Sequence, residues 1–152
     1  ASEPGAASRI YLGDVEGGTP KAVTKEGFQT MQGARWVDAR HFVAFGPDQK
    51  AWLCSIEGGD PKPVPGTSPL DTVARVGEKD GTVWLRRGRG IPARIVQFDL
   101  STGKEEPRME IAPADPTGIV ALLGVRVTRD GRSYAYSYGR VLSDLYVVEG
   151  IK

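Results

Sequence analysis

One phrase recurs in this chain at a nearly constant spacing. Residues 11–23, which read YLGDVEGGTPKAV, return in residues 52–64 as WLCSIEGGDPKPV. Weaker copies occur at residues 96–103 and 145–150. A period of about 40 to 50 residues, made of short apolar runs and glycine turns, is typical of a β-propeller blade. The repeat therefore constrains the architecture of the chain far more than its chemistry.

Glycine and proline clusters separate runs of β-branched and aromatic residues, and no window keeps a helical apolar period. We therefore expect an all-β chain with almost no helix. Asp-Gly pairs at 80–81 and 130–131 predict tight hairpin turns. With four antiparallel strands a to d in each repeat, strands are predicted at residues 9–15, 21–24, 34–37, 41–45, 51–56, 62–64, 72–76, 82–86, 94–100, 108–111, 120–127, 133–138 and 144–148.

These strands divide the chain into blades of four-stranded antiparallel sheets, about half a propeller ring. An open arc would expose an apolar blade face and a strand edge at each end. Three arrangements therefore stay open: the chain is the end of a longer protein, two copies close a ring, or the N-terminal strands complete the last blade. The predicted divisions are a linker (1–8), the outer strands of an incomplete blade (9–24), two blades (25–65 and 66–111) and a blade lacking its last strand (112–152).

Residues 34–38 (ARWVD), 41–45 (HFVAF) and 52–59 (WLCSIEGG) resemble the WD40-like repeat of TolB-like propellers, and residues 127–136 repeat the likeness. The stretch 133–150 resembles the C-terminal end of propeller sensor regions attached to bacterial eukaryote-like Ser/Thr kinases. In that family the propeller follows a kinase domain and a membrane helix. The resemblance implies a sensor part with a ligand-binding or scaffolding role in the periplasm or another extracytoplasmic space.

An arginine occupies a matching place in each predicted strand a, at Arg35, Arg75 and Arg126. Strand a is the innermost strand of a blade, so these guanidinium groups would surround a central channel. There they could bind the carboxylate or phosphate of a small anionic ligand. The alternative is that they pair with acidic residues of the neighbouring blade.

A second basic group lies across the predicted b–c loop of the second full blade, where residues 86–90 read RRGRG. It contains Arg87 and Arg89, and Arg140 occupies the matching loop of the following blade. Glycine-spaced arginines can follow an anionic chain. However, no aromatic residues are interleaved and the net charge is only +1, so we expect no nucleic-acid partner. A solvated loop is the alternative.

Aromatic residues recur at strand positions, and we expect them to pack in the core or between blades. These residues are Trp36, Trp52, Trp84, Tyr134, Tyr136 and Tyr138.

His41 and Cys54 are the only histidine and the only cysteine of the chain. No G-x-S-x-G elbow accompanies His41, so the sequence does not indicate a Ser-His-Asp triad. One histidine and one cysteine cannot supply the usual four zinc ligands. We expect His41 at the start of a strand, Cys54 buried within one, and no metal, cofactor or catalytic residue.

The sequence thus predicts a non-catalytic β-propeller module for binding or scaffolding, the C-terminal part of a larger bacterial sensor protein. Its partner would be a protein, a peptide or a small anionic ligand, and its missing blades or a second copy would complete the ring. The alternative is the accessory propeller of a prolyl oligopeptidase-like hydrolase whose catalytic domain lies outside this chain. No apolar run approaches the roughly 20 residues of a membrane helix, so this chain is not expected to insert into a membrane.

Overall fold

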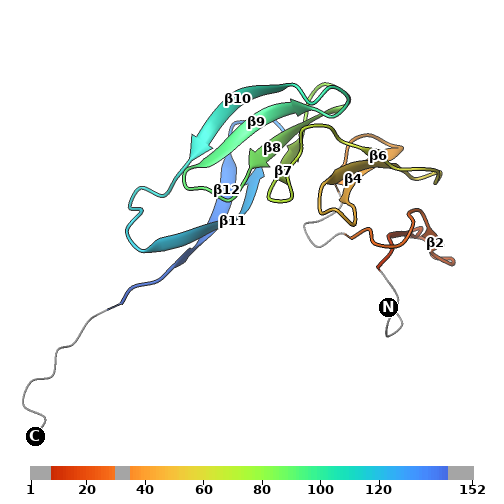
Figure 1. Ribbon diagram of the computed structural model, residues 1–152, viewed down its shortest axis with the longest axis horizontal. Coiled ribbons are helices and arrows are strands. Elements are labelled where there is room, and N and C mark those ends of the chain that lie inside the picture. The colour runs from red at the N-terminus through yellow and green to blue at the C-terminus, as the bar shows by residue number, and fades with distance from the viewer. Residues whose placement is uncertain (1–7, 30–34, 144–152) are drawn as a thin grey trace, which may run out of the picture.

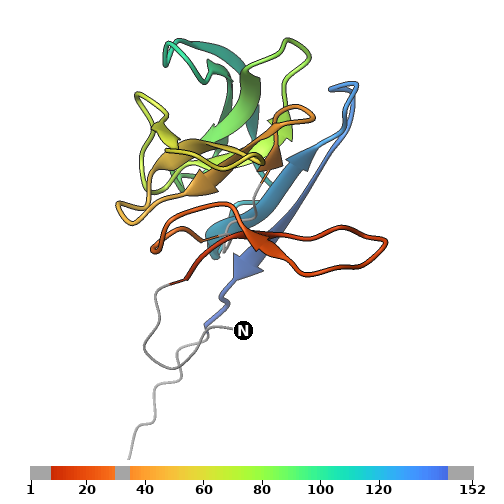
Figure 2. The same ribbon diagram turned by 90° about the vertical axis from the view of Figure 1, so that its right-hand side faces the viewer.

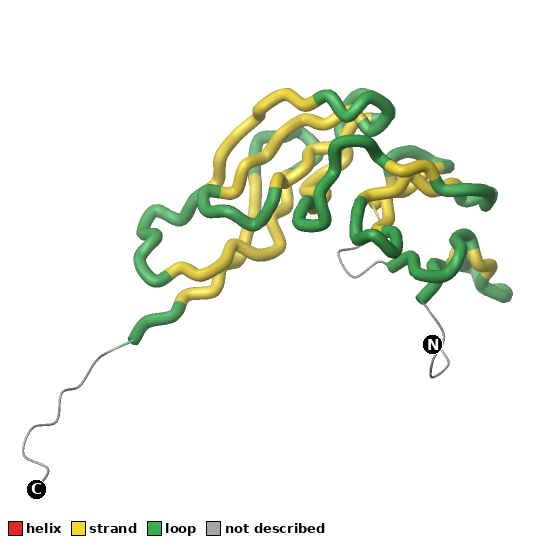
Figure 3. Tube along the Cα trace, in the orientation of Figure 1, coloured by secondary structure: helices red, strands yellow, loops and turns green. Residues whose placement is uncertain are grey.

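A computed structural model describes residues 8–29 and 35–143 of the chain (Figure 1). Within these ranges the chain forms strands, turns and loops without any helix, so no helix there could span a membrane (Figure 3). The strands form four antiparallel sheets, and each sheet is built from consecutive strands. The strands are β1 (Tyr11–Leu12), β2 (Lys21–Ala22), β3 (Arg35–Trp36), β4 (His41–Phe45), β5 (Ala51–Ser55), β6 (Lys62–Pro63), β7 (Thr72–Val76), β8 (Thr82–Arg87), β9 (Ala93–Asp99), β10 (Glu105–Ile111), β11 (Ile119–Val127) and β12 (Tyr134–Arg140).

The all-β class and the four-stranded antiparallel sheets are confirmed. β4 and β7 have the bounds that the sequence predicts, and most other strands differ only at their ends. β10 begins at Glu105, three residues before the predicted start. Pro107 lacks an N–H group, and the pairing of β10 with β9 shifts its register there. The alternation of apolar and polar residues is therefore interrupted at Pro107, which explains why the predicted strand begins after it. The predicted strand at 144–148 lies outside the described residues.

The sheet β7–β10 has buried side chains on both faces. Along β8, Val83 and Leu85 point to one face, whereas Trp84 and Arg86 point to the other. Val83 and Leu85 pack against Val43 and Phe45 of the sheet β3–β6, in what we call the central cluster. The two four-stranded sheets therefore share a core.

Two further clusters extend the packing in both directions. The C-terminal cluster joins the other face of β7–β10 to the hairpin β11–β12, and its buried members include Ile95, Ile111, Leu122 and Val125. The N-terminal cluster joins the other face of β3–β6 to the hairpin β1–β2, and its buried members are Ile10, Val23, Phe28, Phe42, Ala44 and Cys54. The sheets therefore pack in chain order.

Figure 1 shows the four sheets side by side, from β1–β2 at the right to β11–β12 at the left. In Figure 2 the red hairpin of β1 and β2 lies below the orange sheet that contains β4. The first strands of the last three sheets are neighbours, because β7 contacts both β3 and β11. The first strand of each of these sheets is thus the innermost one.

The outer sheets leave large apolar side chains in contact with water. On β11, Leu122 is buried in the C-terminal cluster, whereas Leu123 points the opposite way and is 53% exposed. Val120 on the same strand is also exposed. At the other end of the stack, Tyr11 and Val15 are exposed. An apolar surface therefore remains at both ends of the described part of the chain.

The prediction that the aromatic residues pack in the core is wrong for three of them. Trp36 is 51% exposed at the end of β3, although its ring meets Phe42 edge-on at 5.8 Å between centroids. Tyr134 and Tyr138 are half exposed on β12, a strand that in the described residues pairs only with β11. Their rings contact the ring of Tyr136, which lies between them. Trp52, Trp84 and Tyr136 do pack against the apolar clusters, as predicted.

Replacing Phe98, a fully buried member of the central cluster, tests the shared core. We expect Phe98→Ala to lower the free energy of unfolding by about 3 to 5 kcal/mol, because it removes contacts to both four-stranded sheets. Chemical denaturation measures this loss. Val15, which is fully exposed, gives the control: Val15→Ala should change the free energy of unfolding by less than about 0.5 kcal/mol. A loss below about 1 kcal/mol for Phe98→Ala would contradict the shared core.

Cys54 gives a second test, because its buried position raises the pKa of its thiol to about 11. Only the thiolate reacts with disulfide reagents such as DTNB. We therefore expect no reaction in the folded protein near neutral pH and rapid reaction in denaturant, followed by absorbance. Equal rates in the folded and unfolded protein would show that the N-terminal cluster does not cover Cys54.

Candidate functional site

The three arginines of the innermost strands have different surroundings. Arg126 on β11 donates from Nη1 to the carbonyl oxygen of Val125 at 2.8 Å. Burial, and then the positive charge of Arg35, lower the pKa of Arg126. Arg35 on β3 and Arg126 on β11 thus carry like charges on the two strands that flank β7.

Arg75 on β7 is the most buried of the three, with only 3% of its side chain exposed. Its Nη2 donates to Oε1 of Glu78 at 3.1 Å. Its guanidinium lies over the ring of Trp84, 4.6 Å from the centroid, which is a cation–π contact. Its Nε and Nη1 have no hydrogen-bond partner among the described residues. Buried donors normally have partners, and among the described residues Nε of Arg86 is the other buried side-chain donor that lacks one.

The turn between β11 and β12 covers the Arg75–Trp84 pair. Gly131 N donates to the carbonyl oxygen of Thr128 at 2.9 Å, and Gly131 has a φ of +69°. A Cβ atom at Gly131 would lie 3.1 Å from Nη1 of Arg75 and 3.2 Å from Cη2 of Trp84. Glycine therefore lets this turn approach the guanidinium and the indole closely.

Beside Arg75 lies a cavity of about 600 Å³, which we call the inner-strand cavity. It opens where the innermost strands β3, β7 and β11 end, because Val37 follows β3, Gly77 follows β7 and Val127 ends β11. Equivalent positions of three consecutive repeats thus meet around one cavity. The residues that line it are Val37, Arg75, Val76, Gly77, Glu78, Asp80, Val127 and Arg129.

Arg87, from the second predicted basic group, points toward acidic partners of its own sheet and loop. It pairs with Asp71 at 2.6 Å and with Glu105, and it stacks on Phe98 at 4.9 Å from the ring centroid. Burial opposes its charge, yet the hydrogen bonds to Glu105 and Asp71 raise the pKa of Arg87. Because the Asp71 carboxylate also accepts the backbone N–H of Gly88 at 2.9 Å, this cluster fixes the start of the loop after β8.

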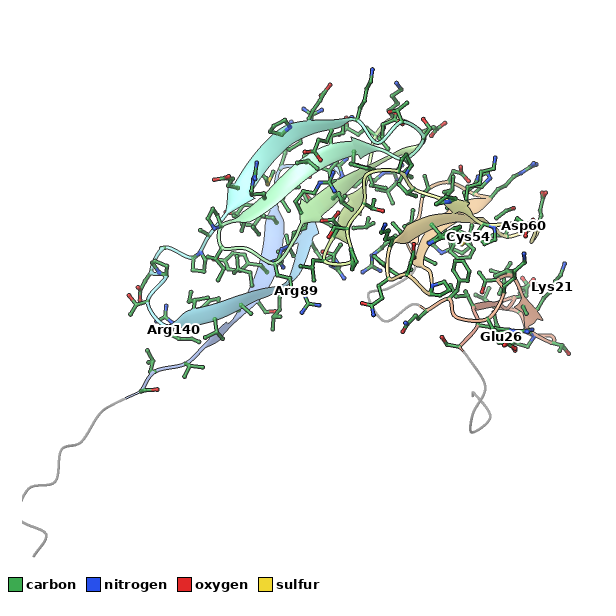
Figure 4. The ribbon with its side chains drawn as sticks, in the orientation of Figure 1. Lys21, Glu26, Cys54, Asp60, Arg89 and Arg140 are labelled. Carbon is green, nitrogen blue, oxygen red and sulfur yellow. The ribbon has the colours of Figure 1, made fainter. Side chains whose placement is uncertain are left out.

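Arg89 and Arg140 do not form one basic patch. Arg89 is exposed, and its side chain has no hydrogen bond or ion pair within residues 8–29 and 35–143. Arg140 donates to the carbonyl oxygen of Asp115 at 2.8 Å and lies over Tyr138 at 5.6 Å from the ring centroid. Figure 4 shows Arg89 and Arg140 at well separated places on the molecule.

His41 begins β4, as predicted, and serves a local turn. Its Nδ1 lies 2.9 Å from Oδ2 of Asp38. The backbone N–H of Arg40, the His41 side chain and the His41 backbone all bond to this carboxylate and lower the pKa of Asp38. The described ranges contain no group of three or more His, Cys, Asp or Glu residues placed to hold a metal ion.

Several residues of the inner-strand cavity gave no signal of their own in the sequence. Val37, Glu78 and Arg129 line the cavity but were not singled out, and Trp84, which packs on Arg75 beside it, was predicted only as a packing residue. The usable signal is their place in the repeat, because Val37 ends one predicted strand a, and Glu78 and Arg129 each lie two residues beyond the end of another. Aligning the repeats at that point would have indicated that they come together.

Comparisons of this chain with protein-family models, with curated proteins and with solved structures find no match.

The pair of Arg87 and Asp71 allows a direct test of its structural role. We expect Arg87→Met to lower the free energy of unfolding by about 3 kcal/mol, because the buried Asp71 carboxylate loses its counter-ion. The matched control is Arg89→Met, which should change stability by less than about 0.5 kcal/mol. Urea denaturation compares the two variants. Similar losses for both would contradict the assignment of Arg87 to the folded core.

Proposed function

We propose that this chain is a segment of a β-propeller, in which each four-stranded sheet is a blade, and that it is a non-catalytic module for binding or scaffolding. One observation carries the proposal: both four-stranded sheets bury both of their faces, and the first strand of each is the innermost one. Propeller blades pack face to face around an axis that their innermost strands surround. The same arrangement explains why the chain repeats with a blade-like period.

In this proposal the described sheets form an open arc, and the apolar side chains at its two ends must be shielded from water. Leu123 and Val120 at one end and Tyr11 and Val15 at the other expose apolar side chains of the kind that the two inner sheets bury. Exposed apolar patches of this kind mark interaction surfaces. We therefore propose that further blades, from a longer protein or from a second copy, complete the ring.

The resemblance to kinase-attached propeller regions supports a role as the C-terminal part of a bacterial sensor outside the cytoplasm. In such a sensor the sheets hold the loops rigid and the loops select the partner, which would be a protein, a peptide or a small anionic ligand. The inner-strand cavity is a candidate site for a small ligand, since it lies where three innermost strands end.

Sedimentation velocity tests the completion of the ring. We expect the isolated chain to self-associate as its concentration rises, because association removes the exposed apolar ends from water. Leu123→Glu should raise the dissociation constant by about tenfold or more, since it places a charge in the contact. Leu70→Glu, at an exposed leucine between β6 and β7, is the control and should leave association unchanged. A chain that stays monomeric at every concentration would contradict the proposal.

A further inference from the structure

We propose that the folded chain forms isoaspartate spontaneously at Asp80 and protects Asp130 from the same reaction. These residues belong to the two Asp-Gly pairs of the sequence, and they lie in equivalent turns, between β7 and β8 and between β11 and β12. The sequence contains no asparagine, which is the other residue that forms isoaspartate readily. The two pairs therefore form an internal comparison of one reaction in two surroundings, and this inference is independent of the proposed ring.

The reaction needs no enzyme and no co-reactant besides water. The backbone nitrogen of the glycine attacks the protonated side-chain carboxyl, so that a C–N bond forms and the nitrogen proton leaves with the carboxyl hydroxyl as water. The product is a five-membered succinimide. Water then adds to its main-chain carbonyl carbon and breaks the original C–N bond there. In the resulting isoaspartate the backbone runs through the side-chain carbons, and the former main-chain carboxyl is a free carboxylate.

The two attacking nitrogens differ in their hydrogen bonds. The turn before β8 is closed by the backbone N–H of Thr82, which donates to the carbonyl oxygen of Lys79 at 3.1 Å. Gly81 is a central residue of that turn, and its N–H has no hydrogen-bond partner in the described part of the chain. In the turn before β12, the N–H of Gly131 itself donates to the carbonyl oxygen of Thr128 at 2.9 Å. Attack by Gly131 must therefore first break a hydrogen bond.

The two carboxylates differ in the same way. Asp80 is exposed, and its side chain makes no hydrogen bond or ion pair within residues 8–29 and 35–143. Oδ1 of Asp130 accepts from Oγ1 of Thr128 at 2.5 Å and from the backbone N–H of Arg132 at 3.1 Å. These hydrogen bonds lower the pKa of Asp130, so they reduce the fraction of the protonated form that the nitrogen attacks. They also hold its carboxyl in place, whereas that of Asp80 is free to rotate.

The space around the two glycines differs as well. A Cβ atom built at Gly81 would meet no atom within 4 Å. One built at Gly131 would lie 3.1 Å from Nη1 of Arg75 and 3.2 Å from Cη2 of Trp84. Ring closure and ring opening both rearrange the backbone of the pair. The turn at Gly81 has room for this rearrangement, whereas the turn at Gly131 must first open away from its neighbours.

The modification changes the rim of the inner-strand cavity. Asp80 lines this cavity, which is the candidate ligand site. Isoaspartate adds one methylene group to the backbone of the turn and keeps one negative charge. The carboxylate at the rim therefore moves, although the mass and the net charge of the chain stay the same.

Ageing of the folded full chain at mildly acidic pH and body temperature tests the proposal. Protein-isoaspartate methyltransferase detects isoaspartate, and peptide mapping with electron-transfer fragmentation assigns it to a residue. We expect at least about tenfold more isoaspartate at Asp80 than at Asp130, because reaction at Asp130 must break the hydrogen bonds of that turn. In urea the preference should disappear. Equal amounts at the two sites of the folded protein, or none at Asp80, would overturn the proposal.

Variants identify the source of the signal. Asp80→Glu keeps the charge but would need a six-membered ring, which closes far more slowly, so it should remove most of the isoaspartate of the folded protein. Asp60→Glu is the matched control, because Asp60 is exposed but precedes a proline, which has no N–H group to attack. It should leave the amount unchanged. The same amount of isoaspartate in Asp80→Glu as in the original chain would overturn the assignment.

The protection of Asp130 has its own test. Thr128→Val removes the hydroxyl that donates to the Asp130 carboxylate, so it should raise isoaspartate at Asp130 by about threefold or more and leave Asp80 unchanged. Circular dichroism shows whether this variant keeps its fold. An unchanged amount at Asp130 in the folded variant would contradict protection by this hydrogen bond. Should the variant fail to fold, the comparison of the two sites in the folded and urea-treated original chain decides instead.

Discussion

Burial of the four-stranded sheets on both faces is the constraint on which the rest of the structure depends. The two faces of β8 are buried by different neighbouring sheets. Val83 and Leu85 on one face pack in the central cluster, whereas Trp84 on the other face packs against the C-terminal cluster. A single antiparallel sheet with apolar residues on both faces would be unstable alone, so its stability comes from the stack. The same requirement explains why the outer sheets expose apolar residues and why we infer that they are covered in the complete assembly.

This packing also determines what the arginines do. Arg86 lies on the buried face of β8, where its Nη1 donates to the carbonyl oxygen of Leu122 at 2.7 Å and so ties two sheets together. Arg87 is held by acidic partners at the sheet margin, and Arg75 is enclosed by Trp84 and the Gly131 turn. A buried guanidinium is costly unless its donors are used. Arg75 and Arg86 both keep buried donors that have no partner among the described residues.

The strands could be predicted from the sequence because their signals are local, whereas the cavity could not. β4 and β7 follow from short apolar runs between turn residues, and Gly131 from an Asp-Gly pair. The start of β10 was missed because Pro107 interrupts the alternation within one strand. The enclosure of Arg75 depends on a turn from the following sheet, and the edge-on contact of Trp36 depends on Phe42 of the neighbouring strand. Neither feature can be predicted from the sequence of a single segment.

Native-state hydrogen exchange tests the dependence of each sheet on its neighbours most directly. The account predicts that the central strands of both four-stranded sheets, β4 and β5 together with β8 and β9, exchange with one common free energy of opening and lose protection together when the shared core is weakened. The stacked arrangement would be contradicted if the two sheets opened independently, with separate free energies of opening, and if weakening the core beside one sheet left the exchange of the other unchanged.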